Sequence, residues 1–265
     1  MYYVFGYRKS VVFKNLSIAF PEKSEAEKIK IAKGFYKLFI DTFIETIKLI
    51  SISKKSFCKR YEFDDSLLTQ IQNTNQNIQL HTGHFFSYEF VNHVFAIHKR
   101  DYNWLGIYSA LSNKAFNKIM FDMRGKFGTT LISSREFRSS FHQYTSKPYM
   151  LGLAADQSTS NPSNAYWVDF FGKKTPFVKG PEKGARAMNT VVMMINIYPF
   201  KRGYYKIESS LLTTEPNSLP QGFITKSLAN FLEEKIKEHP SNYLWSHKRW
   251  KHEYDAEKYA GVTID

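Results

Sequence analysis

The feature that most constrains the fold is an alternation of short apolar runs with longer amphipathic stretches, which starts near residue 78 and continues to residue 238. The short runs are typical of buried strands and the longer stretches of helices. Alternation of this kind predicts an α/β fold with a mainly parallel central sheet flanked by helices. Strands are expected at residues 78–82, 103–108, 129–132, 149–155, 190–198 and 204–210, the last of them antiparallel to its neighbour, and helices at 87–98, 113–123, 134–145 and 221–238.

The residues before this alternation predict an N-terminal helical segment. Ser24 follows a proline-containing turn and precedes Glu27 by three positions, which is the spacing of a capping box at the start of a helix. Apolar residues then recur at helical spacing as far as Ile50. No Pro-, Gly- or Ser-rich linker separates the parts of the chain. We therefore expect a helical segment over residues 1–55, followed by one α/β domain over residues 56–265.

The start of the chain is apolar and aromatic. Residues 1–7 read Met-Tyr-Tyr-Val-Phe-Gly-Tyr and are followed by Arg8 and Lys9. This order fits the interfacial end of a membrane helix, and it fits the first element of a protein core equally well. The sequence has no run of about 18 apolar residues, so it predicts no helix that crosses a bilayer.

Charge and cysteine content narrow the class of partner and the compartment. The chain has 37 Lys and Arg against 24 Asp and Glu, a net charge of +13. Such a surplus predicts an anionic partner, which is nucleic acid, an anionic membrane surface or an acidic protein. The single cysteine, Cys58, excludes an internal disulfide and a multi-cysteine zinc site, and favours a reducing, cytosol-facing location.

His84 and Glu89 are the first candidates for chemistry, because His84 comes directly after the first predicted strand of the sheet. In open α/β sheets, ligands bind at the carboxyl ends of the strands. At this spacing we expect Glu89 to reach one imidazole nitrogen and His84 to act as a general base. The alternative is a buried or helix-capping histidine, which is the commoner role of an isolated motif of this kind. A metal pair of His81 and His84 lacks a third ligand at a plausible spacing.

Three further clusters follow predicted elements. Arg124 lies at a helix-to-strand junction. It is interpreted either as a residue that binds a phosphate or as part of a solvated basic turn. Asp156 ends the most apolar strand, where it serves a site or forms a turn. Residues 167–176 form an apolar run with a tight glycine turn, and a basic loop at residues 179–185 leads into a helix.

Five segments in this order resemble the bacterial lipid A lauroyl/myristoyl acyltransferases, a family of the lysophospholipid acyltransferase superfamily, over nearly the whole chain. The central segment, residues 83–89, is similar to the family's H-x4-D/E catalytic motif, with Glu in place of the commoner Asp. The other segments are residues 8–22 (R…NL…FPE), 124–128 (R-x-x-x-G), 156–157 with 170–172 (DQ…FFG) and 244–251 (WSHRRWK).

The resemblance implies an acyltransferase-like α/β fold that transfers a fatty acyl group to a hydroxyl or amine of a membrane lipid, such as a lipid A precursor. The donor would be acyl carrier protein or acyl-CoA, as a co-substrate, with no metal or redox cofactor. His84 and Glu89 would be the catalytic pair. Substrate-binding roles are expected for Arg124, Asp156, Gln157, Phe171, Gly172, Lys173 and Lys179.

The resemblance also implies a place in the cell, which is the cytoplasmic face of the bacterial inner membrane. Family members usually begin with a membrane-spanning helix, so residues 1–7 are interpreted as the stub of an anchor. The protein is expected to be peripheral there, or anchored by an N-terminal helix that is not in this chain.

Two rival functions stay open at this point. One is acyl transfer to another lipophilic acceptor, namely a lysophospholipid, an aminolipid or a pigment alcohol, because the acceptor pocket lies on loops whose composition is not diagnostic. The other is a non-enzymatic protein that binds a membrane or nucleic acid through the basic and aromatic residues 245–251. This second rival explains the charge but not the other motifs, so nucleic acid is not expected as a partner.

Overall fold

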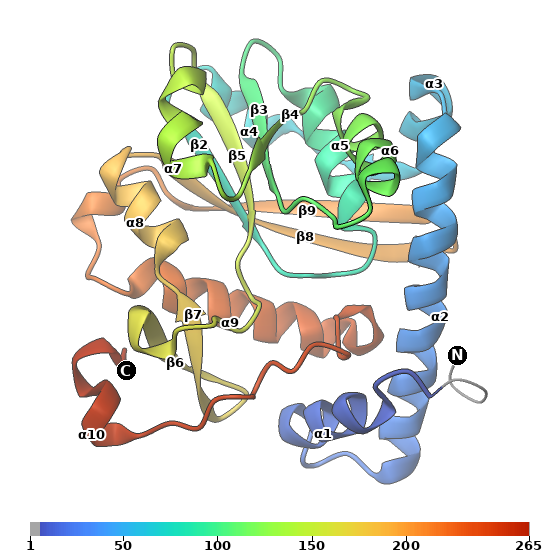
Figure 1. The fold of residues 1–265 in the computed structure, drawn as a ribbon, viewed down its shortest axis with the longest axis vertical. Coiled ribbons are helices and arrows are strands. Elements are labelled where there is room, and N and C mark those ends of the chain that lie inside the picture. Colours follow the sequence, from blue (N-terminus) through green and yellow to red (C-terminus); the bar gives the residue numbers. More distant parts are fainter. Residues whose placement is uncertain (1–5, 265) are drawn as a thin grey trace.

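The computed structural model describes residues 6–264, and its central element is a sheet of seven strands (Figure 1). The strands are β1 (Tyr61–Phe63), β2 (Ile78–Thr82), β3 (Asn103–Tyr108), β4 (Thr130–Ser133), β5 (Tyr149–Ala154), β8 (Val191–Lys201) and β9 (Tyr204–Thr213). They lie in the order β1-β9-β8-β2-β5-β3-β4, and every neighbouring pair is parallel except β8 and β9. The predicted α/β fold with a mainly parallel sheet is confirmed, as is the antiparallel partner strand.

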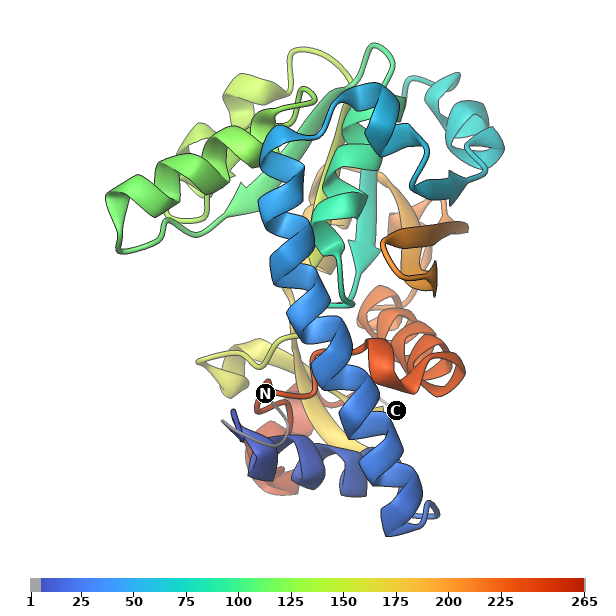
Figure 2. The ribbon, with the colours of Figure 1, turned by 90° about the vertical axis from the view of Figure 1, so that its right-hand side faces the viewer.

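Helices cover the sheet and extend beyond it. They are α1 (Lys9–Ala19), α2 (Glu25–Ser51), α3 (Lys54–Cys58), α4 (Ser66–Gln72), α5 (Tyr88–His98), α6 (Lys114–Gly125), α7 (Phe137–Ser140), α8 (Gly180–Ala187), α9 (Phe223–Glu238) and α10 (Ala256–Tyr259). The long helix α2 runs along one side of the molecule, beside both the sheet and the part that holds α1 and α9 (Figure 2). The predicted N-terminal helical segment is thus present from Lys9 onward, whereas the predictions for residues 1–5 lie outside the described residues. No helix within residues 6–264 combines the length and the apolarity needed to cross a membrane.

Both ends of α2 are fixed by polar contacts. The predicted capping box is present at its start, because the Glu27 N–H donates to the Ser24 hydroxyl and the Glu27 carboxylate accepts the Ser24 N–H. At its end, the Lys126 ammonium donates to the backbone carbonyl oxygens of Leu49, Ile50 and Ile52. A cation at a helix C-terminus is also favoured by the helix dipole. These contacts attach α2 to the α6 side of the sheet.

A hairpin of β6 (Ala165–Phe170) and β7 (Lys173–Val178) occupies the stretch interpreted from sequence as an apolar run and a basic loop. Phe171 and Gly172 form its two-residue turn, and both have positive φ, at 54° and 68°. Two such residues in succession match the twist of antiparallel strands, so the glycine marks a hairpin. The predicted helix at residues 134–145 is reduced to the single turn α7 and a following 3-10 turn.

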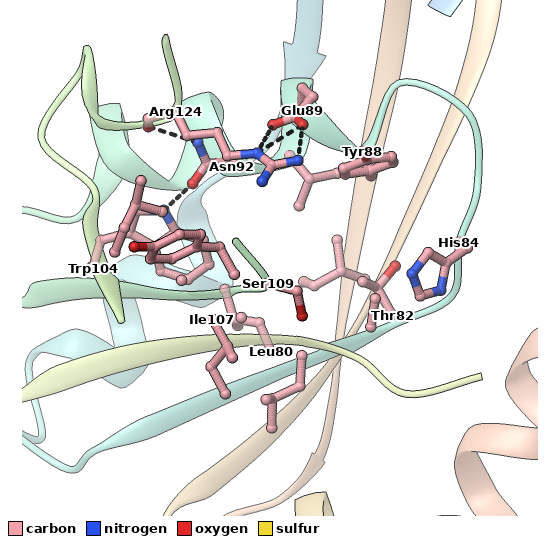
Figure 3. Close-up of a pocket in the computed structure, with 18 of the residues that line it drawn as sticks. Leu80, Thr82, His84, Tyr88, Glu89, Asn92, Trp104, Ile107, Ser109 and Arg124 are labelled. Atoms are coloured by element: carbon pink, nitrogen blue, oxygen red, sulfur yellow. Dashed lines mark hydrogen bonds and ion pairs between the residues drawn. The ribbon is translucent and has the colours of Figure 1, made fainter. Parts of the chain in front are cut away.

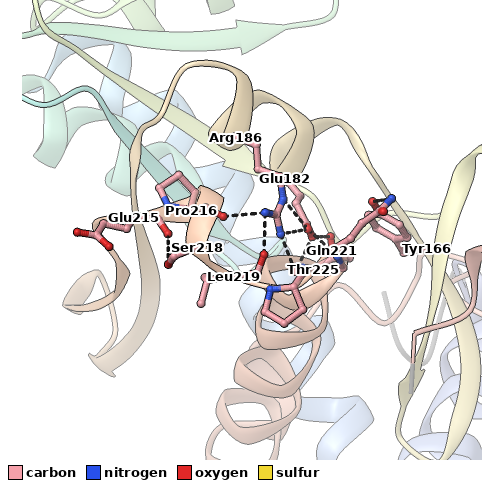
Figure 4. A network of polar contacts seen from close by, with 11 residues as sticks. Tyr166, Glu182, Arg186, Glu215, Pro216, Ser218, Leu219, Gln221 and Thr225 are labelled. Carbon is pink, nitrogen blue, oxygen red and sulfur yellow. Dashed lines mark hydrogen bonds and ion pairs between the residues drawn. The ribbon is translucent and has the colours of Figure 1, made fainter.

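Helix α9 lies between the large sheet and the β6–β7 hairpin (Figure 1). Its first turn is capped by Glu182 of α8, whose buried carboxylate accepts the N–H groups of Gly222 and Thr225 (Figure 4). Further along, Leu232 closes on the end of β2 so tightly that a Cβ at Gly83 would lie 2.6 Å from its methyl group. Gly83 therefore lets α9 support the residue that follows it, His84.

Helix α1 and the residue before it contact a segment near the C-terminus, residues 245–247. On α1, the Asn15 amide donates to the carbonyl oxygens of Trp245 and His247, at 2.8 and 2.7 Å. The Arg8 guanidinium donates to the carbonyl oxygen of Ser246. Helix α1 thus holds the C-terminal segment in place by hydrogen bonds to its backbone.

Candidate active site

His84 and Asp156 form a hydrogen-bonded pair at the carboxyl edge of the sheet. Strands β2 and β5 end at Thr82 and Ala154, which are partners in the register of the two strands. The His84 Nδ1 atom lies 2.5 Å from one Asp156 carboxylate oxygen, and the His84 backbone N–H donates to the other at 3.0 Å. One buried carboxylate therefore fixes both the backbone and the ring of His84, and the second ring nitrogen, Nε2, is not used by this contact.

The two groups shift each other's pKa in opposite directions. Burial alone lowers the pKa of His84, but the charge and hydrogen bond of Asp156 outweigh it and raise this pKa above its ordinary value. For Asp156, burial raises the pKa, and the interactions with His84 and more weakly with Arg249 lower it to about 2. At neutral pH Asp156 is therefore a carboxylate, and His84 is a stronger base than a free histidine.

Glu89 binds Arg124, so the predicted contact between Glu89 and His84 is wrong (Figure 3). The Arg124 Nε and Nη2 atoms donate to one Glu89 carboxylate oxygen at 2.9 and 2.7 Å. The physical reason is the backbone before α5, where Ser87 has a left-handed conformation with φ of 61°. The helix that starts there directs Glu89 toward the last turn of α6, and the Tyr88 ring lies beside His84 instead.

Both polar pairs border one pocket of about 510 Å³ (Figure 3). His84, Glu89, Arg124 and Gln157 line it, and so do apolar side chains from five strands and from the segments next to them. The apolar lining residues include Leu80, Val91, Trp104, Ile107, Leu111, Leu131, Leu153 and Ile195. A cavity with a polar edge and an apolar interior suits a ligand that has a reactive polar end and a long apolar part.

Trp104 lies on the opposite side of this pocket from His84 (Figure 3). Its indole N–H donates to the Asn92 side-chain oxygen at 3.1 Å, and the Asn92 amide donates to the carbonyl oxygen of Arg124 at 2.9 Å. A Cβ at Gly152 would lie 2.6 Å from the Trp104 ring, so the ring closes directly on β5. Hydrogen bonds and close packing therefore fix Trp104 as a wall of the pocket.

The C-terminal segment holds the loop that follows Asp156. The Ser158 N–H donates to His247 Nε2 at 2.9 Å, and the Ser158 hydroxyl donates to the Arg249 carbonyl oxygen at 2.7 Å. Trp245 and Arg249 are completely buried. Trp250 is buried as well, so both tryptophans of the cluster that would bind nucleic acid in the non-enzymatic rival are unavailable for stacking on bases.

The remaining residues expected to bind substrate lie away from this pocket. Phe171 and Gly172 form the β6–β7 turn, and the Phe171 N–H donates to Glu233 of α9. Lys173 begins β7, and Lys179 lies over the Tyr166 ring at 4.6 Å. Their substrate-binding role stays a prediction, since none of the four lines the pocket around His84.

Sequence reasoning missed the partner of His84, although a signal for it exists. His84 and Asp156 come within two residues of the ends of two predicted strands, 78–82 and 149–155, and adjacent parallel strands in register bring such positions together. Asn92 and Trp104 lie inside a predicted helix and strand, and no local pattern marks them as pocket residues. Arg249 was noted for its charge, whereas the structure buries it.

Comparison with known proteins agrees with this arrangement of motifs. Residues 2–252 match the family model described as bacterial lipid A biosynthesis acyltransferase. The chain is similar to lipid A biosynthesis acyltransferase 2 of Shigella flexneri, with 22% identity over 240 residues, covering 87% of this chain and 74% of that protein.

Proposed function

Because the chain belongs to the bacterial lipid A biosynthesis acyltransferase family, we propose that it moves a fatty acyl group from a carrier thioester to a hydroxyl or amine of a lipid A precursor. Acyl carrier protein or acyl-CoA is the donor, and His84 is the general base. The observation that carries this proposal is the His84–Asp156 pair at the edge of a pocket with an apolar interior.

The bond changes follow from the geometry of His84. With Nδ1 hydrogen-bonded to Asp156, Nε2 is the nitrogen that accepts the proton of the acceptor hydroxyl or amine as its oxygen or nitrogen attacks the thioester carbonyl. The carboxylate stabilises the imidazolium that forms and keeps its tautomer fixed. When the tetrahedral intermediate collapses, the carbon–sulfur bond breaks, an ester or amide remains, and the proton on His84 passes to the sulfur of the released thiol.

In this scheme the Glu89–Arg124 pair provides a fixed positive charge for a negatively charged group of the substrates. Burial lowers the pKa of Arg124, and the hydrogen bonds and charge of Glu89 raise it above its ordinary value, so the guanidinium keeps its charge inside the pocket wall. A fixed cation at this place stabilises either the developing oxyanion or a phosphate of one substrate. Glu89, which matches the carboxylate of the family motif, acts here through the position of Arg124.

Exposed apolar side chains on α2 support contact with a membrane surface. Phe43, Ile44 and Ile47 are each more than half exposed, and their spacing puts them on one face of the helix. Lys37 and Lys48 are exposed on the same helix and supply cations for anionic lipid headgroups. Helix α6, which contacts α2, adds further exposed apolar residues such as Phe116 (Figure 2). We place the membrane contact of the protein on this surface.

The test is mass spectrometry of lipid products. Wild-type protein and the variant His84→Ala are incubated with a bacterial lipid extract that contains lipid A precursors, and with long-chain acyl carrier protein or acyl-CoA. We expect one new acylated lipid A precursor with the wild type and none with His84→Ala. The variant His142→Ala, which removes an exposed histidine, is the matched control and should keep full turnover.

Each outcome of this test is informative. An acylated lysophospholipid, aminolipid or pigment alcohol in place of a lipid A product would replace the proposed acceptor by a rival one. Equal product from wild type and His84→Ala would contradict the role of His84. A wild-type protein that modifies no lipid with either donor would contradict the transfer reaction itself.

A further inference from the structure

Arg249 is a buried cation that the reaction above does not use. Its side chain is completely buried, and its Nη1 atom donates to the carbonyl oxygen of Pro176 at 3.0 Å. The guanidinium lies 4.1 Å from the centre of the Phe177 ring, in a cation–π contact. Among the described residues, its Nε and Nη2 atoms have no hydrogen-bond partner. A buried guanidinium with unpaired N–H groups is costly unless a negative charge lies close to it.

Asp156 is a buried carboxylate on the segment that is bound to the segment of Arg249. The two residues belong to segments that are hydrogen-bonded to each other, since the Ser158 hydroxyl donates to the carbonyl oxygens of Lys248 and Arg249 at 3.0 and 2.7 Å. Burial lowers the pKa of Arg249, and Tyr243 and then Asp156 are the groups that raise it. Burial raises the pKa of Asp156, and Arg249 is one of the groups that lower it. Each residue thus stabilises the charged form of the other.

Another buried ion pair of the chain shows what a purely structural arginine looks like. Arg186 donates to Glu182 and to the carbonyl oxygens of Pro216, Leu219 and Pro220, so each of its side-chain nitrogens has a partner (Figure 4). It connects helix ends and lies on the α8 side of the molecule. Arg249 makes a single hydrogen bond to a backbone carbonyl oxygen. The bridging of backbone carbonyl groups therefore does not explain why a charged side chain is buried at this position.

We propose that Arg249 is a positioning residue for the transfer reaction: its buried positive charge favours the carboxylate form of Asp156 and limits how strongly the His84–Asp156 pair binds a proton. The inference rests on the proposed function, because it explains how the C-terminal segment takes part in the reaction without contacting substrate. It also gives a role to the basic and aromatic residues 244–251, the last segment of the family resemblance, which the mechanism above does not use.

Other titratable groups also face His84 and Asp156. Burial lowers the pKa of His247 to about 4 and raises that of Tyr243, so both are uncharged at neutral pH. On the other side of the pocket, the charges of Glu89 and Arg124 oppose each other. The groups that face His84 and Asp156 are Tyr88, Glu89 and Arg124 from α5 and α6, and Tyr243, His247 and Arg249 from the C-terminal segment.

The test is an NMR titration of the His84 ring in the substrate-free protein. In Arg249→Met the loss of a positive charge favours the protonated ring, so we expect the His84 pKa to rise on the order of one unit. Arg249→Lys keeps the charge and should restore the wild-type titration. Arg186→Met removes the arginine of the Glu182 ion pair, on the α8 side of the molecule, and should leave the His84 titration unchanged. If Arg249→Met does not fold, Arg249→Gln is the second neutral variant.

The direction of the shift separates this role from a merely structural one. If Arg249 only supported the fold, its loss would displace Asp156, and burial would then lower the His84 pKa. A lowered or unchanged His84 pKa in the folded neutral variant would overturn the proposal. The titration needs no turnover, so an inactive wild type with the expected shift would contradict the proposed function alone. An active wild type without the shift would contradict only the role of Arg249.

Discussion

His84 and Asp156 each stand two residues beyond paired strand ends, and the His84 ring nitrogen Nδ1 lies 2.5 Å from the Asp156 carboxylate. The register of β2 and β5 alone brings the two positions together, because Thr82 and Ala154 are partners in it. Neither residue needs a special loop conformation to meet the other. The meeting of the pair therefore follows from the pairing of the two strands.

Replacement of Asp156 by Asn should slow turnover on the order of 10³-fold, because the ring loses the charge that stabilises its protonated form and fixes its tautomer. Without that charge, burial governs the ring, so the His84 pKa should fall below its ordinary value of 6.5. The acidic limb of the pH profile of kcat/KM should accordingly move to lower pH. Asp169→Asn, which changes an exposed aspartate on β6, is the control. An unchanged acidic limb in Asp156→Asn would show that another group titrates there.

Replacement of Glu89 by Gln should leave a slow enzyme, with kcat/KM reduced on the order of 10²-fold. A neutral amide cannot hold Arg124 by charge, so the guanidinium loses its fixed place in the pocket wall. The His84 titration should stay as in the wild type, because the imidazole contacts Asp156 and not Glu89. Asp122→Asn breaks an exposed ion pair on α6 and should keep full activity. A Glu89→Gln protein whose His84 pKa falls would point to direct contact between Glu89 and the ring during the reaction.

Trp104 should limit the length of the acyl chain that the pocket accepts, since its ring closes the side opposite His84. Trp104→Leu should shift the preferred donor to a longer chain, and Gly106→Ala, which adds a methyl group to the same lining, should shift it to a shorter one. A difference of one methylene in an apolar pocket is worth roughly 10- to 200-fold in discrimination. Competition between acyl donors of different length measures both shifts. A length preference that ignores both substitutions would place the acyl chain elsewhere.

Vesicle binding should depend on the exposed face of α2. Ile47→Glu removes an exposed apolar contact and adds a charge that anionic headgroups repel, so affinity for anionic vesicles should fall at least about tenfold. Leu211→Glu changes an exposed leucine on β9 and serves as the matched control. Added salt should weaken binding further through the lysines of α2. Equal loss in both variants, or no loss in either, would exclude α2 as the membrane contact.

Most of the sheet could be predicted from the sequence because each strand carries its own apolar run. Residues 191–195 are all buried, and that burial appears in the sequence as the unbroken apolar run Val-Val-Met-Met-Ile. The β6–β7 hairpin was missed because Phe171 takes a left-handed conformation that favours glycine or asparagine, so only Gly172 signals the turn. Such a turn is stabilised by pairing of the strands, which is not a local property.

The residues that the structure brings together at the candidate site could be identified from the sequence, but their contacts could not. His84, Glu89, Arg124 and Asp156 were all identified from their places after strands and helices. Which carboxylate meets the imidazole depends on the Ser87 backbone, whose positive φ turns Glu89 toward Arg124. No residue preference announces that conformation, because Ser rarely adopts it.

The hydrogen bonds from Asn15 to the carbonyl oxygens of Trp245 and His247 have a consequence for how the protein is made. The ribosome synthesises α1 among the first elements and the segment it binds more than two hundred residues later. Val12 and Leu16, which are buried in the finished protein, must stay uncovered or be shielded by a chaperone during that interval. The Asp156 loop likewise waits for His247 and Arg249. The loop after Asp156 therefore gains these hydrogen bonds only once residues 247–249 have been synthesised.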